Sequence, residues 1–340
     1  MNYRLLGPGG LRVSELCLGT MTFGIDHPRA AIGTDAAREV VDRFRAAGGN
    51  FIDTANMYTG GESERVIGEI VAPFRSEMVL ASKYGNSMNP ADPNAGGMHR
   101  KNLVQSVEQS LRRLKTDYID LYYIHAWDRF TALDEVLRAL DDLVRAGKIL
   151  HIGASNTPAW RVAQANARAS LRQQTPFSAV QVQYNLADRT IENEMVPMAR
   201  ALDVAVVAWS PLAMGVLTGK YLEGGGSGRL AGAAGSGGGL LNERSQAIAR
   251  LCVALGGEIG ATPGQVATAW LLTRNAIPII GGSAPAHFDE AVASRLVALN
   301  ADALARLDNA TAPAPSQPGA LFPRIDTMVH GEAVTRIVPR

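Results

Sequence analysis

The sequence has few cysteines and no long hydrophobic run. Only Cys17 and Cys252 occur among 340 residues, each flanked by apolar residues, which argues against a disulfide framework and favours a reducing compartment. No stretch of roughly 18 uncharged apolar residues is present, so no membrane-spanning helix is predicted. The N-terminus reaches a Pro-Gly-Gly turn before an apolar signal core could form. We therefore expect a cytoplasmic protein that is neither exported nor inserted in a membrane.

An excess of charge of either sign is also absent. The chain has 33 Lys and Arg residues against 32 Asp and Glu residues, a formal net charge of +1. No basic stripe is present, so no nucleic-acid partner is expected. Hydrophobic residues make up 46% of the chain and charged residues 19%, which excludes overall disorder. The length suits a large barrel, and we expect residues 1–340 to form a single domain.

Short apolar runs alternate with amphipathic stretches, a pattern typical of parallel strands joined by crossover helices. The predicted strands are 15–19, 51–55, 78–82, 118–125, 150–155, 179–184, 204–210 and 277–282. The predicted helices between them are 35–48, 63–73, 100–114, 133–147, 157–169 and 191–202. Eight strand–helix units predict an α/β fold, the (β/α)8 TIM barrel. Residues 1–14 alternate polar and apolar around a GPGG turn, which predicts an N-terminal hairpin.

Two regions are predicted to be irregular. Residues 224–239 are rich in Gly and Ser and form a loop after the seventh strand, either as a lid over the barrel or as a tolerated insertion. The C-terminal tail, residues 311–340, is Pro-rich and has Leu321 and Phe322 as possible anchors. This tail either covers the barrel mouth or packs on the surface.

Polar residues at successive strand ends indicate a chemical site, because active sites of parallel barrels lie at the carboxyl ends of the strands. Asp53 lies at the end of the second strand, with Tyr58 in the loop after it; Lys83 follows the third strand and His125 ends the fourth. Each alone is more often a cap or a packing residue, but together they suggest a proton-donating set. The histidines lack the spacing of metal ligands, so no metal site is predicted.

The proton donor of this set would be the phenol of Tyr58. A phenol is a poor acid at neutral pH unless its phenolate is stabilised. An ammonium ~4 Å away, at an effective dielectric of ~20, supplies ~4 kcal/mol, or ~3 pK units, against at most ~1 kcal/mol from a helix dipole. We therefore expect Lys83 to lower the pKa of Tyr58, and Asp53 to orient Lys83. His125 would donate a hydrogen bond to a carbonyl oxygen or relay its proton, and the set would stabilise the alkoxide formed when hydride arrives.

Four long motifs resemble the aldo-keto reductases: GNFIDTANMYTGGESERVIGE (49–69), DYIDLYYIHAWD (117–128), ALDDLVRAGKILHIGASN (139–156) and WSPLAMGVLTGKY (209–221). The likeness covers roughly residues 1–300 and is strongest to the bacterial, longer-chain branch that includes the potassium-channel β subunits. It implies a barrel that binds NADP(H) in extended form and reduces aldehydes or ketones by direct hydride transfer. Asp53, Tyr58, Lys83 and His125 match the catalytic positions, with Tyr58 as proton donor. No Rossmann glycine fingerprint follows the first strand.

The same matching implies the cofactor contacts. Ser155, Asn156 and Gln181 match the groups that bind the nicotinamide carboxamide, and Trp209 either stacks on the nicotinamide ring or belongs to the core. Thr20 lies near the ribose, and Asp53 counts among the cofactor residues as well as the catalytic ones. The residues that match the loop around the pyrophosphate are Ser210, Pro211, Leu212, Gly215, Leu217 and Lys220.

One departure concerns the adenosine end of the cofactor. The stretch after the eighth strand contains no Lys or Arg and has Ala291 where asparagine is usual; its candidate residues are Gly281, Gly282, Ser283, His287 and Glu290. Losing two charge-assisted hydrogen bonds, at ~1.5–3 kcal/mol each, would weaken NADP(H) binding ~10²–10⁴-fold. NADP(H) is the first expectation and NAD(H) is left open, with Ser283, His287, Arg229 or Lys220 as compensating groups.

These observations predict an NAD(P)H-dependent oxidoreductase that reduces small-molecule carbonyls, reversibly, to alcohols. The alternative is a nicotinamide-binding regulatory or accessory subunit with slow turnover. Ala126 stands beside His125 where many relatives carry a larger polar residue, which would enlarge the pocket. The candidate pocket walls, equally credible as core or rim packing, are Met21, Phe23, Met57, Tyr84, Trp127 and Phe322. They favour an apolar or aromatic substrate.

Overall fold

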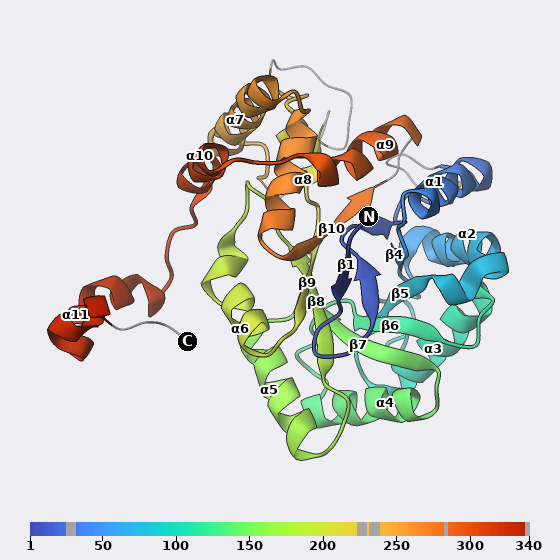
Figure 1. Cartoon of the computed structure of the whole chain (residues 1–340). Helices are drawn as coiled ribbons and strands as arrows, with labels where there is room; N and C mark the ends of the chain where they lie inside the picture. The colour runs from blue at the N-terminus through green and yellow to red at the C-terminus, as the bar shows by residue number, and fades with distance from the viewer. Residues whose placement is uncertain (25–31, 223–229, 231–238, 282–284, 337–340) are drawn as a thin grey trace.

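Eight parallel strands close into a barrel, in the order β10-β3-β4-β5-β6-β7-β8-β9, which confirms the predicted (β/α)8 fold (Figure 1). The computed structural model describes residues 1–24, 32–222, 230, 239–281 and 285–336. The barrel strands are β3 (Cys17–Gly19), β4 (Phe51–Asp53), β5 (Val79–Tyr84), β6 (Ile119–Ile124), β7 (Ile149–Ser155), β8 (Phe177–Gln183), β9 (Ala205–Trp209) and β10 (Ala276–Gly281). All eight coincide with predicted runs, because short β-branched and aromatic segments are buried on both faces of a parallel sheet.

Helices surround the barrel between successive strands. Those predicted from the sequence are α1 (Thr34–Ala46), α2 (Glu62–Val71), α3 (Arg100–Leu114), α4 (Leu133–Arg145), α5 (Ala159–Leu171) and α6 (Met195–Ala201). Four more were not predicted: α7 (Glu243–Ile259), α8 (Pro263–Thr273), α9 (Pro285–Ala293) and α10 (Ala301–Thr311). Helix α8 is buried along most of its length, since it packs between α7 and β10. A helix that is apolar on most sides shows no amphipathic period.

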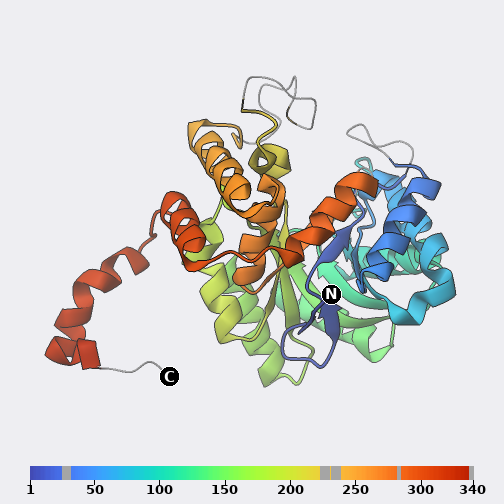
Figure 2. The same cartoon turned by 45° about the horizontal axis from the view of Figure 1, so that its top comes forward.

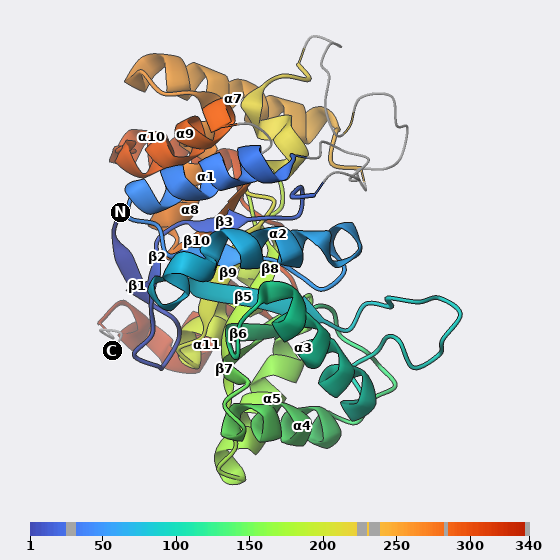
Figure 3. The same cartoon turned by 90° about the vertical axis from the view of Figure 1, so that its right-hand side faces the viewer.

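The two ends of the barrel differ. The predicted N-terminal hairpin is present: β1 (Tyr3–Leu5) pairs antiparallel with β2 (Arg12–Ser14). Its Leu6 and Val13 are fully buried and join the side chains that fill the barrel interior, so the hairpin closes the base. Figure 3 shows the hairpin on one side of the molecule and the long loop between β5 and α3 on the opposite side, at the mouth.

The C-terminal tail differs from its prediction in two ways. The expectation of an irregular segment is wrong for Phe322–His330, which form α11, flanked by 3-10 turns at Gly319–Leu321 and Gly331–Arg336. The tail also does not cover the barrel mouth: Figures 1 and 2 show α11 standing clear of the barrel beyond α10. Phe322 is 53% exposed and is therefore no wall of the pocket. The predicted Gly-rich loop lies outside the described residues except at Leu230 and Gly239.

Candidate active site

Neighbouring strand ends bring the four predicted catalytic side chains together. Asp53 is the last residue of β4, Lys83 lies near the end of β5 and His125 follows β6 directly. Tyr58 begins a 3-10 turn, Tyr58–Gly61, in which Thr59 and Gly60 have positive φ angles of 47° and 64°. This tight turn brings the chain back at the mouth, so that the phenol meets Lys83.

The ammonium of Lys83 is the centre of the cluster. Its side chain is 0% exposed and that of Asp53 is 3% exposed. Nζ donates to Asp53 Oδ2 at 2.6 Å, to the Thr54 carbonyl at 2.8 Å and to Tyr58 Oη at 3.1 Å. These bonds use all three N–H groups of an ammonium, which has no acceptor. The phenol oxygen of Tyr58 therefore accepts from Lys83, and its own hydrogen is free to point into the site.

Burial and the Asp53 carboxylate act on Lys83 in opposite directions. Burial by itself lowers the pKa of Lys83, but the nearby Asp53 carboxylate and Tyr58 outweigh it, and the pKa is raised. Lys83 is consequently a cation at every physiological pH. Asp53 contacts the ammonium that it is expected to hold charged and oriented, and this role stays a prediction.

The expected direction of the Tyr58 pKa is wrong. Burial raises the pKa of Tyr58 above that of an ordinary phenol, Lys83 opposes this rise, and Asp53 adds to it. The sequence argument counted the ammonium alone, whereas Asp53 sits at 2.6 Å from that ammonium and offsets its charge as seen from the phenol. Tyr58 is therefore protonated at neutral pH, and Lys83 acts by stabilising the phenolate only as the proton leaves.

His125 is a neutral imidazole. Burial, helped by the charge of Lys83, lowers the pKa of His125 to about 3. Its ring meets that of Tyr58 edge-on at a centroid distance of 5.9 Å. Nδ1 is buried and has no hydrogen-bond partner among the described residues, which leaves Nε2 as the ring nitrogen that can meet a substrate oxygen. His125 can thus donate a hydrogen bond without carrying charge.

This depressed pKa predicts an acid-dependent loss of stability. Below pH 6.5 the unfolded chain protonates this histidine, whereas the folded protein does so only near pH 3, so stability falls as pH falls through that window. His125→Gln, which cannot be protonated, should lose about 2–3 kcal/mol less than the wild type between pH 7 and pH 4. Urea unfolding of both proteins at pH 7, 5.5 and 4 measures the difference. Equal losses in the two proteins would show that His125 is not held neutral.

The residues expected to bind a carboxamide form a second network at the same strand ends. Gln181 Nε2 donates to Asp53 Oδ1 at 2.7 Å, so this amide is tied to the catalytic pair. Asn156 Nδ2 donates to the His125 carbonyl at 3.0 Å and to Ser155 Oγ at 3.1 Å, and its Oδ1 accepts from Trp209 Nε1 at 3.1 Å. The sequence did not reveal these links between the two groups, because they join strands far apart in the chain.

The loop after β9 contains backbone that favours glycine. Ser210, Ala213, Met214 and Gly215 all have positive φ angles, and that of Gly215 is 91°. A Cβ on Gly215 would lie 2.7 Å from Cε of Lys220, so the lysine stem lies against the loop. Leu217 and Pro211 are buried, and Leu217 packs in the second hydrophobic core cluster. Leu212 is partly buried.

The remaining predicted cofactor residues do not share one environment: some are bonded within the fold, one is exposed and others lie outside the described residues. The Thr20 hydroxyl is buried and already bonded to the Asp53 carbonyl and to Ser63 Oγ, so it is engaged within the fold. Gly281 ends β10 and is exposed. Glu290 bonds Thr262, the N-cap of α8, a contact within the protein. Gly282, Ser283, Arg229 and the side chain of His287 lie outside the described residues.

Two predicted pocket walls are core residues. Phe23 and Tyr84 are fully buried, whereas Met21 and Met57 are 37% and 38% exposed and belong to loops at the mouth. Trp127 is half-buried and packs at the edge of the main core.

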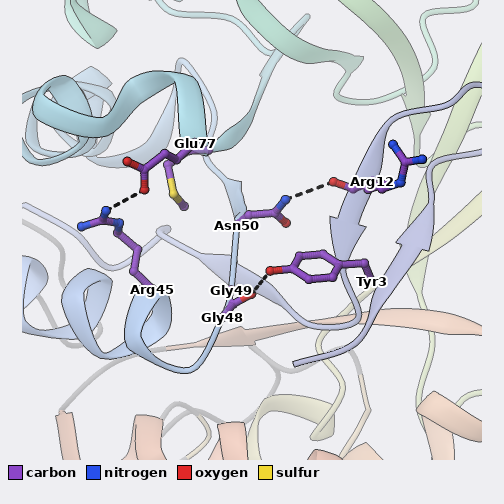
Figure 4. A pocket seen from close by; sticks show the side chains of 8 residues that line it. Tyr3, Arg12, Arg45, Gly48, Gly49, Asn50 and Glu77 are labelled. Carbon is purple, nitrogen blue, oxygen red and sulfur yellow. Dashed lines mark hydrogen bonds and ion pairs between the residues drawn. The ribbon is translucent and has the colours of Figure 1, made fainter.

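A hollow of about 430 Å³ lies at the opposite end of the barrel, beside the hairpin (Figure 4). Several of its polar groups are paired with one another: Arg45 with Glu77 at 2.8 Å, Tyr3 with the Gly48 carbonyl at 2.9 Å, and Asn50 with the Arg12 carbonyl at 3.0 Å. This hollow is a joint between the hairpin and the barrel base, remote from the strand ends that carry the candidate site.

No cluster of three or more potential metal-ligating side chains occurs in the described residues, and no described helix is long and apolar enough to span a membrane.

Comparison with known proteins gives one consistent result. The profile of the Aldo/keto reductase family matches residues 15–312. The chain is 36% identical to the uncharacterized oxidoreductase YrpG of Bacillus subtilis over 323 residues, 91% of this chain and 95% of that protein. It is 35% identical to the aryl-alcohol dehydrogenase GME11368 of Pestalotiopsis microspora over 312 residues, 88% and 79% of the two chains.

A third relative is matched over a shorter part. The chain is 45% identical to the norsolorinic acid reductase stcV of Emericella nidulans over 223 residues, 63% of this chain and 58% of that protein. The alignment thus spans less than two thirds of that relative's length.

Proposed function

This chain belongs to the aldo/keto reductase family, and from that premise we propose that it is a nicotinamide-dependent oxidoreductase that interconverts small-molecule carbonyls and alcohols, with Tyr58 as the proton donor. The observation that carries the proposal is the set of three hydrogen bonds that the Lys83 ammonium donates to Asp53, to the Thr54 carbonyl and to Tyr58. This arrangement leaves the phenol hydrogen directed away from Lys83. Reductase and dehydrogenase names among the relatives support the same reaction class.

The donor set suits a nicotinamide cofactor. Ser155 and Asn156 supply hydroxyl and amide groups at the end of β7, Gln181 retains a carbonyl oxygen to accept a carboxamide N–H, and Trp209 presents a half-buried ring. Lys220 forms no ion pair within the described chain and can meet a phosphate. A bound reduced nicotinamide would supply the hydride. NADP(H) is our first choice and NAD(H) the second, because residues 281–291 contain no Lys or Arg.

The side chains of the site then have distinct tasks. His125, neutral, donates a hydrogen bond to the substrate oxygen and fixes its position. Tyr58 gives its proton to the same oxygen as negative charge develops there, and Lys83 stabilises the phenolate left behind through the bond it already makes. Preorganised donors of this kind need no rearrangement during the reaction. Asp53, backed by Gln181, holds the ammonium in place.

A turnover assay tests the proposal. Purified protein with NADPH or NADH and a panel of aromatic and aliphatic aldehydes should oxidise many equivalents of cofactor, followed at the nicotinamide absorbance. We expect NADPH to exceed NADH by less than ~100-fold in kcat/KM, since the charge-assisted contacts to a 2′-phosphate are missing. A larger ratio would contradict our interpretation of residues 281–291. A single equivalent oxidised and held would contradict the reductase and indicate a regulatory subunit.

A further inference from the structure

An arginine that packs against two tryptophan rings lies beside the candidate site. The guanidinium carbon of Arg161 is 4.1 Å from the ring centroid of Trp160 and 5.0 Å from that of Trp127. Nη1 donates to Gln164 Oε1 at 2.9 Å. Nε is buried and has no hydrogen-bond partner among the described residues, and no carboxylate in the described chain forms an ion pair with Arg161. The charge of this side chain is therefore unmatched within the part of the protein that the structure describes.

The stack belongs to the mouth of the barrel. Arg161 lies in the first turn of α5, which follows β7, and helical side chains lean toward the N-terminal end of their helix. Trp127 is two residues beyond His125, and its backbone N–H bonds the Asn156 carbonyl at 3.3 Å. Asn156 in turn bonds the His125 carbonyl. Arg161 is thus linked to the candidate catalytic histidine through one tryptophan and one asparagine.

The local field at this rim is positive. The first turn of α5 has no acidic residue, and its N-cap, Pro158, supplies no side-chain bond, so the positive end of the helix dipole is uncompensated there. Two acidic side chains on neighbouring segments, Asp128 and Asp134, are engaged elsewhere. Asp128 accepts from the backbone of Met98 and Phe130 and from Thr131, and Asp134 pairs with Arg168 and Arg172.

We propose that Arg161 binds a carboxylate at the end of the substrate remote from the reacting carbonyl, so that the enzyme favours aldehyde or keto acids. A guanidinium packed against two aromatic rings has already lost most of its side-chain freedom. Nη2 and the second N–H of Nη1 make no hydrogen bond within the described residues, which suits planar, bidentate capture of a carboxylate. This inference rests on the proposed reductase function.

Matched substrates provide the kinetic test. 4-Carboxybenzaldehyde and 4-carbamoylbenzaldehyde have the same shape and differ in charge. The wild type should favour the acid, mainly through KM. Arg161→Met, which keeps an unbranched apolar stem, should raise KM for the acid roughly 10- to 100-fold, the effect of losing charge-assisted bonds. KM for the amide and both kcat values should change by less than about twofold. Arg161→Lys should recover part of the loss, because the charge returns without the fork.

Two controls separate the possible failures. Arg129→Met removes a neighbouring rim arginine that lies over Phe130; it should leave the acid-to-amide ratio unchanged, and an equal loss would overturn the specific role of Arg161. Calorimetric titration with benzoate and with neutral benzamide measures binding without turnover, and Arg161→Met should weaken only benzoate. Selective loss of benzoate binding in a protein that reduces no aldehyde would refute the reductase and retain the anion site. Turnover with an unchanged acid-to-amide ratio in Arg161→Met would refute the anion site and retain the reductase.

Discussion

Replacing Tyr58 by phenylalanine should reduce kcat for aldehyde reduction by about 10²–10⁴, the usual contribution of a positioned general acid. Among the described residues, the phenol is the only group in contact with Lys83 that can give a proton to a substrate oxygen, since Asp53 and the Thr54 carbonyl are acceptors in that cluster. The nucleotide dissociation constant should change by less than about twofold, because the ring and the turn that carries it are retained. Stopped-flow reduction together with nucleotide binding measures both quantities.

Tyr84→Phe is the matched control for this substitution. Tyr84 ends the strand that carries Lys83, is fully buried and bonds only the Met98 carbonyl at 3.3 Å within the described residues. Removal of its hydroxyl should leave kcat within a few-fold of the wild type. Because burial raises the pKa of Tyr58 above that of an ordinary phenol, reduction by the wild type should also show no loss of the acid between pH 6 and pH 9. More than a tenth of wild-type turnover in Tyr58→Phe would rule out the phenol as the proton donor.

Lys83→Met should cost both activity and stability. The substitution leaves the Asp53 carboxylate buried without its cation, and breaking one half of a buried ion pair typically costs about 3–5 kcal/mol. It also removes the cation that stabilises the phenolate, so kcat should fall about as far as in Tyr58→Phe. Urea unfolding at pH 7 measures the first effect and single-turnover reduction the second. The pKa of Lys83 is raised, so the stability of the pair is fully present below pH 10.5 and is lost only as pH rises through the folded value.

The double variant Asp53→Asn with Lys83→Met separates the two effects. With both charges gone, most of the stability should return, because replacing a buried pair is often nearly neutral, whereas turnover should stay low. A double variant as active as the wild type would show that the ammonium is not needed for chemistry. Conversely, Lys83→Met with wild-type stability would mean that Asp53 and Lys83 are not coupled as charges.

Local patterns were sufficient for most of the barrel. The eight strands were predictable because each is a short, buried apolar run between turn signals, and the amphipathic helices α1–α5 show the period of a half-buried helix. Helices α8 and α10 were missed for different reasons. Helix α8 is buried on most sides, so its sequence shows no amphipathic period. Helix α10 follows the last barrel strand, where the alternation of strand and helix has ended. Helix α11 was missed because a Pro-rich composition suggests irregular chain.

The residues of the candidate site could be predicted from the sequence, but the contacts between them could not. Asp53, Lys83 and His125 were predicted from their positions at strand ends, which a parallel barrel necessarily collects at one mouth. The links through Gln181 and Asn156 could not be predicted, since hydrogen bonds between β4 and β8 or between β6 and β7 depend on strand order around a closed barrel. The packing of Arg161 against Trp127 and Trp160 could not be predicted either. Arg161 is adjacent to Trp160 in the sequence, but Trp127 lies on a distant segment of the chain.

By itself, the sequence determined the strand–helix alternation, the chemical types gathered at the strand ends and the family, because these follow from local periodicity and residue identity. The tertiary structure alone decided how those groups act on one another. It placed Asp53 against Lys83 and buried Tyr58, which reversed the direction of the phenol pKa expected from the lysine alone. Charge interactions and desolvation depend on distances and burial in three dimensions, and neither quantity is encoded in the spacing of residues along the chain.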